Sequence, residues 1–364
     1  MVSTRGARVK KYLIGINIVV VFLYLLICLV PFLESGSFWF IAFLGLGFPI
    51  LFVPVFLFLL IWSLKRSKWA LLSLFAIVLS WQQLSAVFAY NFQKPDIDLK
   101  DDKVLRVMSW NVSRWDERNK VKRGGQSFRN LMMDFIDFQN ADVLCLQEFF
   151  ECHDPAFFDA NIPALKKMGF GYHYFFPTAE IFDRKFQYGL AIFSKYPIID
   201  TGSFLNKARI HSEGLCYADI RISEKIVRVF NSHLESPGLN QDDFSEDGRV
   251  IPSGGTLGKI KRSYQFRNEQ AKLAKEQINK SPFPAIICSD LGDVPNSYAY
   301  FKLKGDFNDA FLEKGRWLGR TYRFISPTLR IDYIFVQKGV KVKQFIRPDV
   351  TYSDHYPIVA DIVF

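Results

Sequence analysis

The N-terminal quarter of the chain consists mainly of three long segments without a charged residue. They cover residues 12–33, 35–64 and 69–93, and are therefore 22, 30 and 25 residues long. About 20 predominantly apolar residues are enough for an α-helix to cross the hydrocarbon core of a bilayer. The sequence therefore predicts a membrane anchor of three transmembrane helices, near residues 12–33, 38–62 and 69–90, and excludes a simple cytosolic enzyme.

The first apolar segment follows a short basic stretch, as it does in a cleaved signal peptide. The segment is longer than the apolar core of a signal peptide, which has about 7–15 residues, and two further apolar segments follow it. We expect Pro31, Pro49 and Pro54 to kink or end the helices, which membrane helices tolerate when neighbours satisfy the backbone. The three spans contain no ionisable Asp, Glu, Lys, Arg or His, so they are interpreted as an anchor rather than an ion pathway.

Basic residues flank the apolar segments unevenly. Residues 5–11 contain four of them and residues 65–68 contain three, whereas residues 34–37 contain none. Because cytoplasmic loops carry the excess of Lys and Arg, the N-terminal tail and residues 65–68 are predicted to face the cytoplasm. Three crossings then make this a multi-pass protein of the cell membrane with an extracytoplasmic C-terminal domain. The alternative is a helical hairpin with one interfacial helix, which would leave that domain inside.

The formal net charge of +10 comes mostly from the membrane segments. Residues 1–94 hold eight Lys or Arg and one acidic residue, whereas the other 270 residues hold 38 basic and 35 acidic ones. The C-terminal domain is therefore close to neutral, and charge gives no positive case for nucleic acid as its partner.

The five cysteines have no regular spacing and form no CxxC motif. They are predicted to be isolated apolar packing residues, and a disulfide that uses Cys152 is left open.

From residue 104 onward, short apolar segments of strand length alternate with helical ones. We expect an anchor at residues 1–93, a polar linker at 94–103 and a second domain at 104–364. Strands are predicted at 104–111, 143–148, 190–194, 216–222, 226–233, 285–290, 330–335 and 356–363, and helices at 127–139 and 264–279.

Several of these strands end in hydrogen-bonding or ionisable side chains, or are followed by them. Open α/β sheets form their ligand crevice at the carboxyl ends of the strands. A turn or a cap explains any one such residue, but the whole set favours a functional site. Its members are Asn111, Gln147, Glu148, Asn231, His233 and Asp290, together with the sequence Ser353-Asp354-His355 before the last strand.

The residue types of this set indicate its chemistry. Glu148, Asp290 and Asp354 offer hard oxygen ligands of the kind that Mg²⁺ or Mn²⁺ prefers. His233 and His355 can donate to phosphate oxygens or move a proton near neutral pH. The chain has no HExxH, GxSxG or Walker sequence; the stretch 254–259 has the wrong spacing, and Gly254-Gly255 is predicted to be a flexible loop. Metal-assisted hydrolysis of a phosphate ester is the reaction that fits.

Six short motifs in this order resemble the endonuclease/exonuclease/phosphatase superfamily, in a membrane-anchored, bacterial-type form. They lie at residues 109–112, 146–148, 188–194, 231–234, 330–335 and 353–355. The resemblance covers residues 104–364 and implies a DNase I-like α/β four-layer sandwich behind the three-helix transmembrane segment.

The resemblance also implies roles for the metal ligands. Glu148 resembles the principal Mg²⁺ ligand, with Asn111 and Asp354 assisting it. Asp290 resembles the carboxylate that orients or deprotonates the attacking water.

The remaining motifs imply contacts with the phosphate. His233 resembles a donor to the phosphate, and Asp332 resembles the partner that holds His355, which contacts the scissile phosphate or assists proton transfer. Asp332 as a strand-end cap and Tyr188 as an ordinary packing residue are the alternatives to their catalytic roles.

The chain departs from the family pattern after Asp290, where the family has Asn and this sequence has Gly292. The literal sequence Gly-Asp-Phe-Asn at 305–308 does not follow a buried strand, so Asp306 is interpreted as a surface residue rather than the catalytic one. Oriented donors can contribute about 10²–10³ in rate, so the loss of one predicts slower hydrolysis.

The sequence thus predicts a membrane-anchored Mg²⁺- or Mn²⁺-dependent phosphoesterase. Its predicted partners are the lipid bilayer and a phosphate ester, which is a lipid, a nucleic acid or a small phosphodiester. No protein partner is predictable. The alternative is a catalytically impaired or inactive binding module, because Gly292 lacks the amide of the family.

Overall fold

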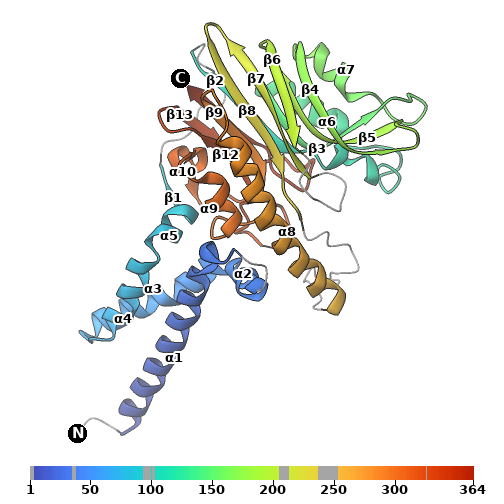
Figure 1. The fold of residues 1–364 in the computed structure, drawn as a ribbon. Coiled ribbons are helices and arrows are strands. Elements are labelled where there is room, and N and C mark those ends of the chain that lie inside the picture. Colours follow the sequence, from blue (N-terminus) through green and yellow to red (C-terminus); the bar gives the residue numbers. More distant parts are fainter. Residues whose placement is uncertain are drawn as a thin grey trace.

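The computed structural model of the chain describes residues 4–34, 38–92, 100, 103–204, 213–236, 253–324 and 326–364. A helical N-terminal segment projects from a domain built on two β-sheets (Figure 1).

One helix of the N-terminal segment is long and apolar enough to cross a membrane. It covers Gly6–Phe32, which comprises most of α1 (Thr4–Cys28) and the short 3₁₀ helix η1 (Val30–Phe32), and its most apolar 18 residues have a mean hydropathy of 3.0. The predicted second span is split into α2 (Trp39–Gly45) and α3 (Phe48–Leu64), bent by 68°, and the predicted third into α4 (Ala70–Leu79) and α5 (Trp81–Val87), bent by 65°. Of the three predicted helices, only the first is therefore a single long helix, and the second and third are each broken into two.

Each bend has a local cause. The first falls beside Gly47, immediately before the first turn of α3, which contains Pro49, and proline cannot continue the hydrogen bonding of a preceding helix. Pro54 lies inside α3 without ending it. The second falls at Ser80, whose hydroxyl donates to the carbonyl of Ile77 at 3.0 Å and lies 2.6 Å from the hydroxyl of Tyr24. Side chains that bond back to the helix in this way bend helices.

Polar pairs join the helices of the N-terminal segment to one another. The Ser73 hydroxyl donates to Asn17 Oδ1 at 3.1 Å, and Gln83 Nε2 donates to the carbonyl oxygen of Cys28 at 2.9 Å. Such hydrogen bonds hold helices together in a membrane, where apolar packing against lipid favours no particular partner.

The C-terminal domain contains two six-stranded sheets, each with one parallel pair among antiparallel neighbours. The first has the strand order β13 (Lys341–Ile346), β14 (Ile358–Val363), β2 (Leu105–Asn111), β3 (Val143–Cys152), β5 (Phe186–Ser194) and β4 (Tyr172–Ile181). The second has the order β10 (Asn308–Asp309), β12 (Asp332–Val336), β9 (Ala285–Asp290), β8 (Lys225–His233), β7 (Gly214–Ile222) and β6 (Ile198–Phe204). The parallel pairs are β2 with β3 and β8 with β9.

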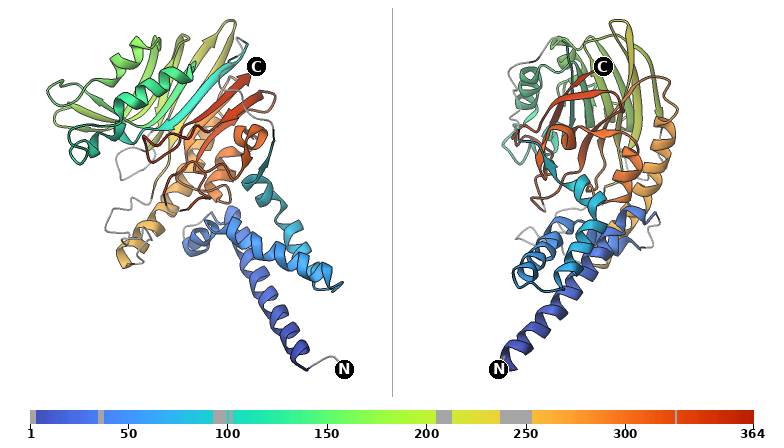
Figure 2. Two further views of the ribbon diagram at one scale, coloured as in Figure 1. Left: turned by 180° about the vertical axis from the view of Figure 1, so that it is seen from behind. Right: turned by 90° about the vertical axis from the view of Figure 1, so that its left-hand side faces the viewer.

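The two sheets pack face to face and helices cover their outer faces, as Figures 1 and 2 show. On one side lie α6 (Arg129–Gln139) and α7 (Asn161–Lys167), and on the other α8 (Gly254–Ile278) and α9 (Tyr298–Lys304). The predicted four-layer α/β sandwich is confirmed. Its apolar residues form one core between the sheets and one under each pair of helices.

Helix α8 begins earlier than predicted. Gly254 and Gly255 form the start of its first turn rather than a flexible loop, because Ser253 accepts a hydrogen bond from the backbone amide of Thr256 at 3.1 Å and caps the helix. The strands β4, β6 and β13 and the helices α7 and α9 were not predicted. The shorter elements are η3 (Ser113–Asn119), α10 (Ala310–Lys314), β1 (Ala89–Tyr90) and β11 (Arg316–Trp317).

The domain contacts the helical segment at several places (Figure 2). Strand β1, which follows α5, pairs with β11 of the domain. Asn268 Nδ2 of α8 donates to the carbonyl oxygens of Leu33 and Glu34, at 3.2 and 3.1 Å. Asn296 Nδ2 donates to the carbonyl oxygen of Ile27, in the last turn of α1, at 3.2 Å.

Candidate active site

The predicted site residues come together where the two parallel strand pairs end. Asn111 is the last residue of β2, His233 the last of β8 and Asp290 the last of β9. His233 and Asp290 are neighbours in register, and Asp290 is also paired with Asp332, the first residue of the antiparallel β12. The carboxyl ends of both parallel pairs therefore form one edge, as the sequence predicts.

The carboxylate of Asp290 lies at the centre of the site. It accepts hydrogen bonds from Asn111 Nδ2 and from the backbone amide of Gly292, both at 2.9 Å. Its Oδ2 lies 3.6 Å from His233 Nε2 and 3.7 Å from His355 Nε2. Although burial opposes ionisation, the two imidazoles and the two hydrogen bonds hold the pKa of Asp290 below its ordinary value.

His355 is held in place by Asp332. Its Nδ1 lies 3.0 Å from both carboxylate oxygens of Asp332, and its carbonyl oxygen accepts a hydrogen bond from Trp110 Nε1 at 2.9 Å. Although burial opposes protonation, the charges of Asp332 and Asp290 raise the pKa of His355 well above its ordinary value. Burial raises the pKa of Asp332 to about 6, against the attraction of His355. Near neutral pH the pair is therefore an imidazolium beside a carboxylate.

Glu148 occupies an irregular position in β3. The register with β5 shifts between Leu146 and Phe149, and Glu148 has a φ of +46°, which is uncommon for a residue other than glycine. Such a bulge turns one side chain out of the regular alternation. Burial raises the pKa of Glu148, and the charges of Asp354 and Asp290 raise it further, against His233 and His355. These charges place Glu148 in the same site.

The donor set fits a hard divalent cation. Glu148, Asp354 and Asn111 all offer oxygen atoms, the ligands that Mg²⁺ and Mn²⁺ prefer. Among the described residues none donates a hydrogen bond to the carboxylate of Glu148, and its Oε2 lies 3.6 Å from Arg114 Nε. Ser353 supports two of these ligands, since its hydroxyl donates to the carbonyl of Asn111 at 2.7 Å and lies 3.1 Å from Asp354 Oδ1.

A second group of potential ligand atoms consists of Asp290, Asp332 and His355, whose atoms lie within 4.8 Å of one another. In this group His355 Nδ1 and both oxygens of Asp332 already contact each other. This is the arrangement of a histidine that is oriented by a carboxylate, rather than of three side chains that are free to bind a metal ion.

Tyr188 lies at the margin of the site. Its ring stacks on Phe150 with the centroids 5.0 Å apart, and the guanidinium of Arg114 lies 5.0 Å from its centroid. Burial raises the pKa of Tyr188. Arg114 therefore lies near both Tyr188 and Glu148. The catalytic role of Tyr188 stays a prediction.

The literal sequence Gly-Asp-Phe-Asn at 305–308 lies away from the site. The side chain of Asp306 is 96% exposed, whereas Asp290 is 2% exposed. Gly305 has a φ of +48° and ends α9, and a short strand and α10 follow, as expected for a surface turn before a short helix.

Three buried charged residues near the site were not predicted. They are Glu213, before β7, Glu235, two residues after His233, and Arg267 in α8. Burial and the neighbouring carboxylate of Glu235 raise the pKa of Glu213 to about 9. The other candidates were selected because they lie at, or just after, the end of a predicted strand. Of these three residues only Glu235 meets that criterion.

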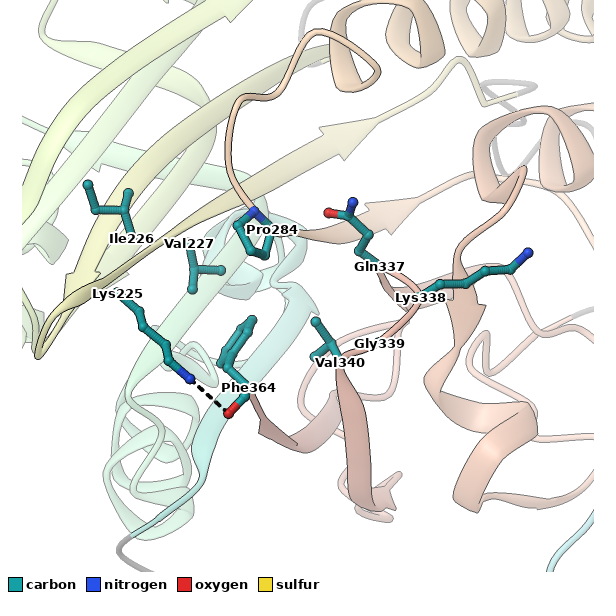
Figure 3. A pocket seen from close by; sticks show the side chains of 9 residues that line it. All are labelled: Lys225, Ile226, Val227, Pro284, Gln337, Lys338, Gly339, Val340 and Phe364. Atoms are coloured by element: carbon teal, nitrogen blue, oxygen red, sulfur yellow. Dashed lines mark hydrogen bonds between the residues drawn. The ribbon is translucent and has the colours of Figure 1, made fainter.

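An open hollow of about 460 Å³ lies at the other ends of the strands (Figure 3). It is lined by the start of β8, by Pro284 before β9 and by Phe364, whose carbonyl oxygen accepts a hydrogen bond from Lys225 Nζ at 3.1 Å. Its lining contains none of the predicted site residues.

The sequence profile of the Endonuclease/Exonuclease/phosphatase family matches residues 108–355, from β2 to His355. The chain belongs to this family. A domain of unknown function (DUF8431) matches residues 10–87, which include most of the helical segment. No curated protein matches the chain.

Solved structures share the fold at low sequence identity. An endonuclease/exonuclease/phosphatase from Beutenbergia cavernae is 17% identical with a TM-score of 0.51, covering 72% of both chains. The human Nocturnin catalytic domain with a bound sulfate anion is 18% identical with a TM-score of 0.51, covering 73% of this chain and 96% of its own. D. rerio TDP2 complexed with a single-strand DNA product is 20% identical with a TM-score of 0.50, covering 72% of this chain and 100% of its own.

Proposed function

We propose that this family member is a membrane-anchored phosphoesterase that uses Mg²⁺ or Mn²⁺ to hydrolyse a phosphate ester. The observation that carries the proposal is the environment of Asp290. Its ionised carboxylate accepts two hydrogen bonds and lies between the imidazoles of His233 and His355. A carboxylate of this kind beside further oxygen ligands suits attack by water rather than a covalent intermediate.

Each residue of the site has a proposed part in that attack. Asp290 accepts a hydrogen bond from the attacking water and takes its proton, since its lowered pKa keeps it ionised. His233, whose Nδ1 has no hydrogen-bond partner among the described residues, donates to a phosphate oxygen. His355, positioned by Asp332, contacts the scissile phosphate as an imidazolium and supplies a proton to the leaving group.

Glu148, Asn111 and Asp354 are proposed to hold the cation. When bound, it would neutralise the charge that develops on the phosphate oxygens. The support for this assignment is the oxygen chemistry of the three side chains and the free hydrogen-bonding capacity of the Glu148 carboxylate within the described residues.

The helical segment is proposed to be a multi-pass anchor at residues 1–93, joined by residues 94–103 to the catalytic domain at 104–364. Each bent helix pair is then one crossing, and the distribution of basic residues places the catalytic domain outside the cytoplasm. Residues 94–99 and 101–102 of the predicted linker lie outside the described residues.

The path of the chain after Asp290 favours a substrate at the membrane surface. Only five residues separate Asp290 from Asn296, which donates to a carbonyl oxygen in the last turn of α1. The catalytic edge therefore lies close to the end of the helix that is long enough to span the bilayer. A phosphate ester in a lipid headgroup is the preferred substrate class, ahead of a nucleic acid or a small phosphodiester.

The test is a panel of phosphate esters with the full chain purified in detergent. It contains bis-p-nitrophenyl phosphate, DNA, sphingomyelin and phosphoinositides, each with Mg²⁺, Mn²⁺ or EDTA. We expect metal-dependent hydrolysis. We also expect its loss in Glu148→Gln, because this variant lacks the negative charge of the principal ligand of the cation. Asp306→Asn is the matched control, because this exposed aspartate lies in the literal family motif.

The rival function is a binding module without catalysis, which the glycine at position 292 favours. A folded wild-type chain that is no faster than Glu148→Gln on every ester would support this rival. A Glu148→Gln variant with wild-type activity at limiting Mg²⁺ would instead remove Glu148 from the ligand set.

A further inference from the structure

The guanidinium of Arg267 is fixed in the interior of the domain. The residue is 1% exposed, its Nη1 donates to Asp293 Oδ2 at 2.8 Å and its Nε donates to the carbonyl oxygen of Glu235 at 2.9 Å. The ring of Tyr264 lies 4.9 Å from the guanidinium carbon. The third nitrogen, Nη2, is buried and has no hydrogen-bond partner among the described residues. Buried donors are almost always paired, so an unpaired one on a fixed group calls for a ligand.

Arg267 lies against the turn that follows Asp290. A Cβ atom on Gly292 would lie 3.7 Å from both Nε and Nη2 of Arg267. The amide of the same glycine donates to the carboxylate of Asp290 at 2.9 Å. The guanidinium therefore borders the space that a side chain at position 292 would enter, one turn of chain away from the proposed base.

The charges around Arg267 keep it cationic and leave Nη2 available. Asp293 neutralises it on one side, and Asp290 contributes a second negative charge. Glu213 and Glu235 lie near it, and the Oε2 atom of each also lacks a partner within the described part of the chain. None of these carboxylates accepts a hydrogen bond from Nη2.

The low exposure of Arg267 does not separate it from the site. Asp290 is 2% exposed and His233 is 3% exposed, so the proposed base and a proposed phosphate donor are as deeply enclosed as Arg267. The charge of Asp290 acts on Arg267, and both side chains border the turn at Gly292.

We propose that Arg267 is a catalytic residue whose Nη2 donates to a non-bridging phosphate oxygen of the substrate and replaces the donor that is missing at Gly292. This inference rests on the proposed function. A guanidinium is well suited to the task, because it is always charged and its hydrogen bonds to phosphate are short and charge-assisted. A purely structural arginine would need only the bonds of Nε and Nη1.

The first experiment measures kcat/KM of the full chain with substitutions at both positions. Arg267→Ala should lower kcat/KM by about 10²–10³, the range for an oriented donor. Gly292→Asn should give no gain in the wild-type background but should recover about tenfold or more in the Arg267→Ala background, since an amide then enters the vacated space. Asn is also among the residues that best tolerate the positive φ of +58° at this position.

The second experiment measures binding of inorganic phosphate by calorimetry and does not depend on turnover. Arg267→Lys keeps a positive charge beside Asp293 but loses the planar fork, and it should weaken phosphate binding about tenfold or more. Arg262→Lys is the matched control, because this arginine lies on the exposed face of the same helix. Circular dichroism shows whether each variant is folded, and Arg267→Lys decides the question if Arg267→Ala does not fold.

The outcomes separate this inference from the proposed function. A wild-type chain that binds phosphate through Arg267 but hydrolyses no ester would support the inference and defeat the proposed hydrolysis. Folded Arg267 variants that keep phosphate affinity and kcat/KM within about threefold of an active wild type would overturn the inference alone. So would a Gly292→Asn substitution that gives no recovery in the Arg267→Ala background.

Discussion

The charge on His355 is set by two neighbouring acids. Asp332 contacts its Nδ1 with both carboxylate oxygens, and Asp290 lies on the Nε2 side. Both acids favour the imidazolium, so the protonated form extends above the ordinary range of histidine. Individual residues thus decide over which pH range His355 keeps its proton.

Asp332→Asn should therefore shift the pH dependence of catalysis. Without the carboxylate the pKa of His355 falls, so the alkaline limb of the kcat/KM profile should move to lower pH. The rate at the optimum should also fall, by about 10²–10⁴ for a general acid. An alkaline limb that stays in place, with Asp306→Asn as the control, would show that Asp332 does not set the charge of His355.

Glu213→Gln should stabilise the protein at high pH. The pKa of Glu213 is raised from 4.5 to about 9, so the folded chain keeps a proton that the unfolded chain releases. Stability is then lost as the pH rises from 4.5 to 9, and glutamine avoids this loss.

Thermal unfolding at pH 5 and pH 9 checks the prediction for Glu213. We expect a small difference at pH 5 and a higher Tm for the variant at pH 9, by about 2–4 °C for each kcal/mol of repulsion removed. The exposed Glu224→Gln serves as the control. An equal gain at both pH values would contradict the ionisation of Glu213 as its cause.

At the scale of elements, a buried arginine that is ion-paired within the domain also bonds to the helical segment. Arg330 Nη1 donates to Asp309 Oδ2 at 2.6 Å, and its Nη2 donates to the carbonyl oxygen of Ala86, in α5, at 2.7 Å. Asp309 also caps α10 through the backbone amide of Phe311. The end of α5, the start of α10 and the approach to β12 are thus held by the same two side chains.

Asp309→Asn should destabilise the chain strongly, because it leaves the buried guanidinium of Arg330 without its counter-charge. Removal of one partner from a buried pair costs about 3–5 kcal/mol. Urea unfolding of the detergent-solubilised full chain, followed by tryptophan fluorescence, measures the loss. The double variant Asp309→Leu/Arg330→Met should be less destabilised than Asp309→Asn, and the opposite order would contradict an electrostatic origin.

The strand ends were predictable from the sequence, whereas the helix contribution to the site was not. Asn111, His233 and Asp290 follow apolar strands, and parallel strands end at a common edge. The left-handed bulge at Glu148 depends on the pairing of β3 with β5, a long-range contact that no local pattern records. Arg267 lies on a helix whose other buried residues are mostly apolar or uncharged, and its role depends on the packing of α8 against the turn at Gly292.

At the scale of the whole molecule, the number of membrane spans depends on the two bent helix pairs. The described residues contain one helix that meets the criteria for a span by itself, and up to three spans if each bent pair is one crossing. The sequence predicted the apolar segments and a kink or break at Pro49, but not the bend at Ser80, which depends on the hydroxyl of that residue.

Cysteine labelling in intact cells tests the proposed topology. Ser67→Cys and a cysteine at position 3 should be protected from an impermeant thiol reagent, whereas Ser223→Cys, on the exposed turn between β7 and β8, should react. The native cysteines are buried thiols and give a low background. Labelling of Ser67→Cys together with protection of Ser223→Cys would place the domain on the cytoplasmic side.

The contacts between the domain and the helices have a consequence for how a substrate is met. Strand β1 pairs with β11, and Asn268 and Asn296 bond to backbone carbonyls at the end of the first helix. These contacts hold the domain in one orientation to the helical segment, unlike a domain on a flexible tether. If that segment spans the bilayer as proposed, an ester in the same leaflet reaches the catalytic edge by lateral diffusion in two dimensions. Turnover would follow the mole fraction of that ester among the lipids, and dilution with inert lipid would slow it at constant bulk concentration.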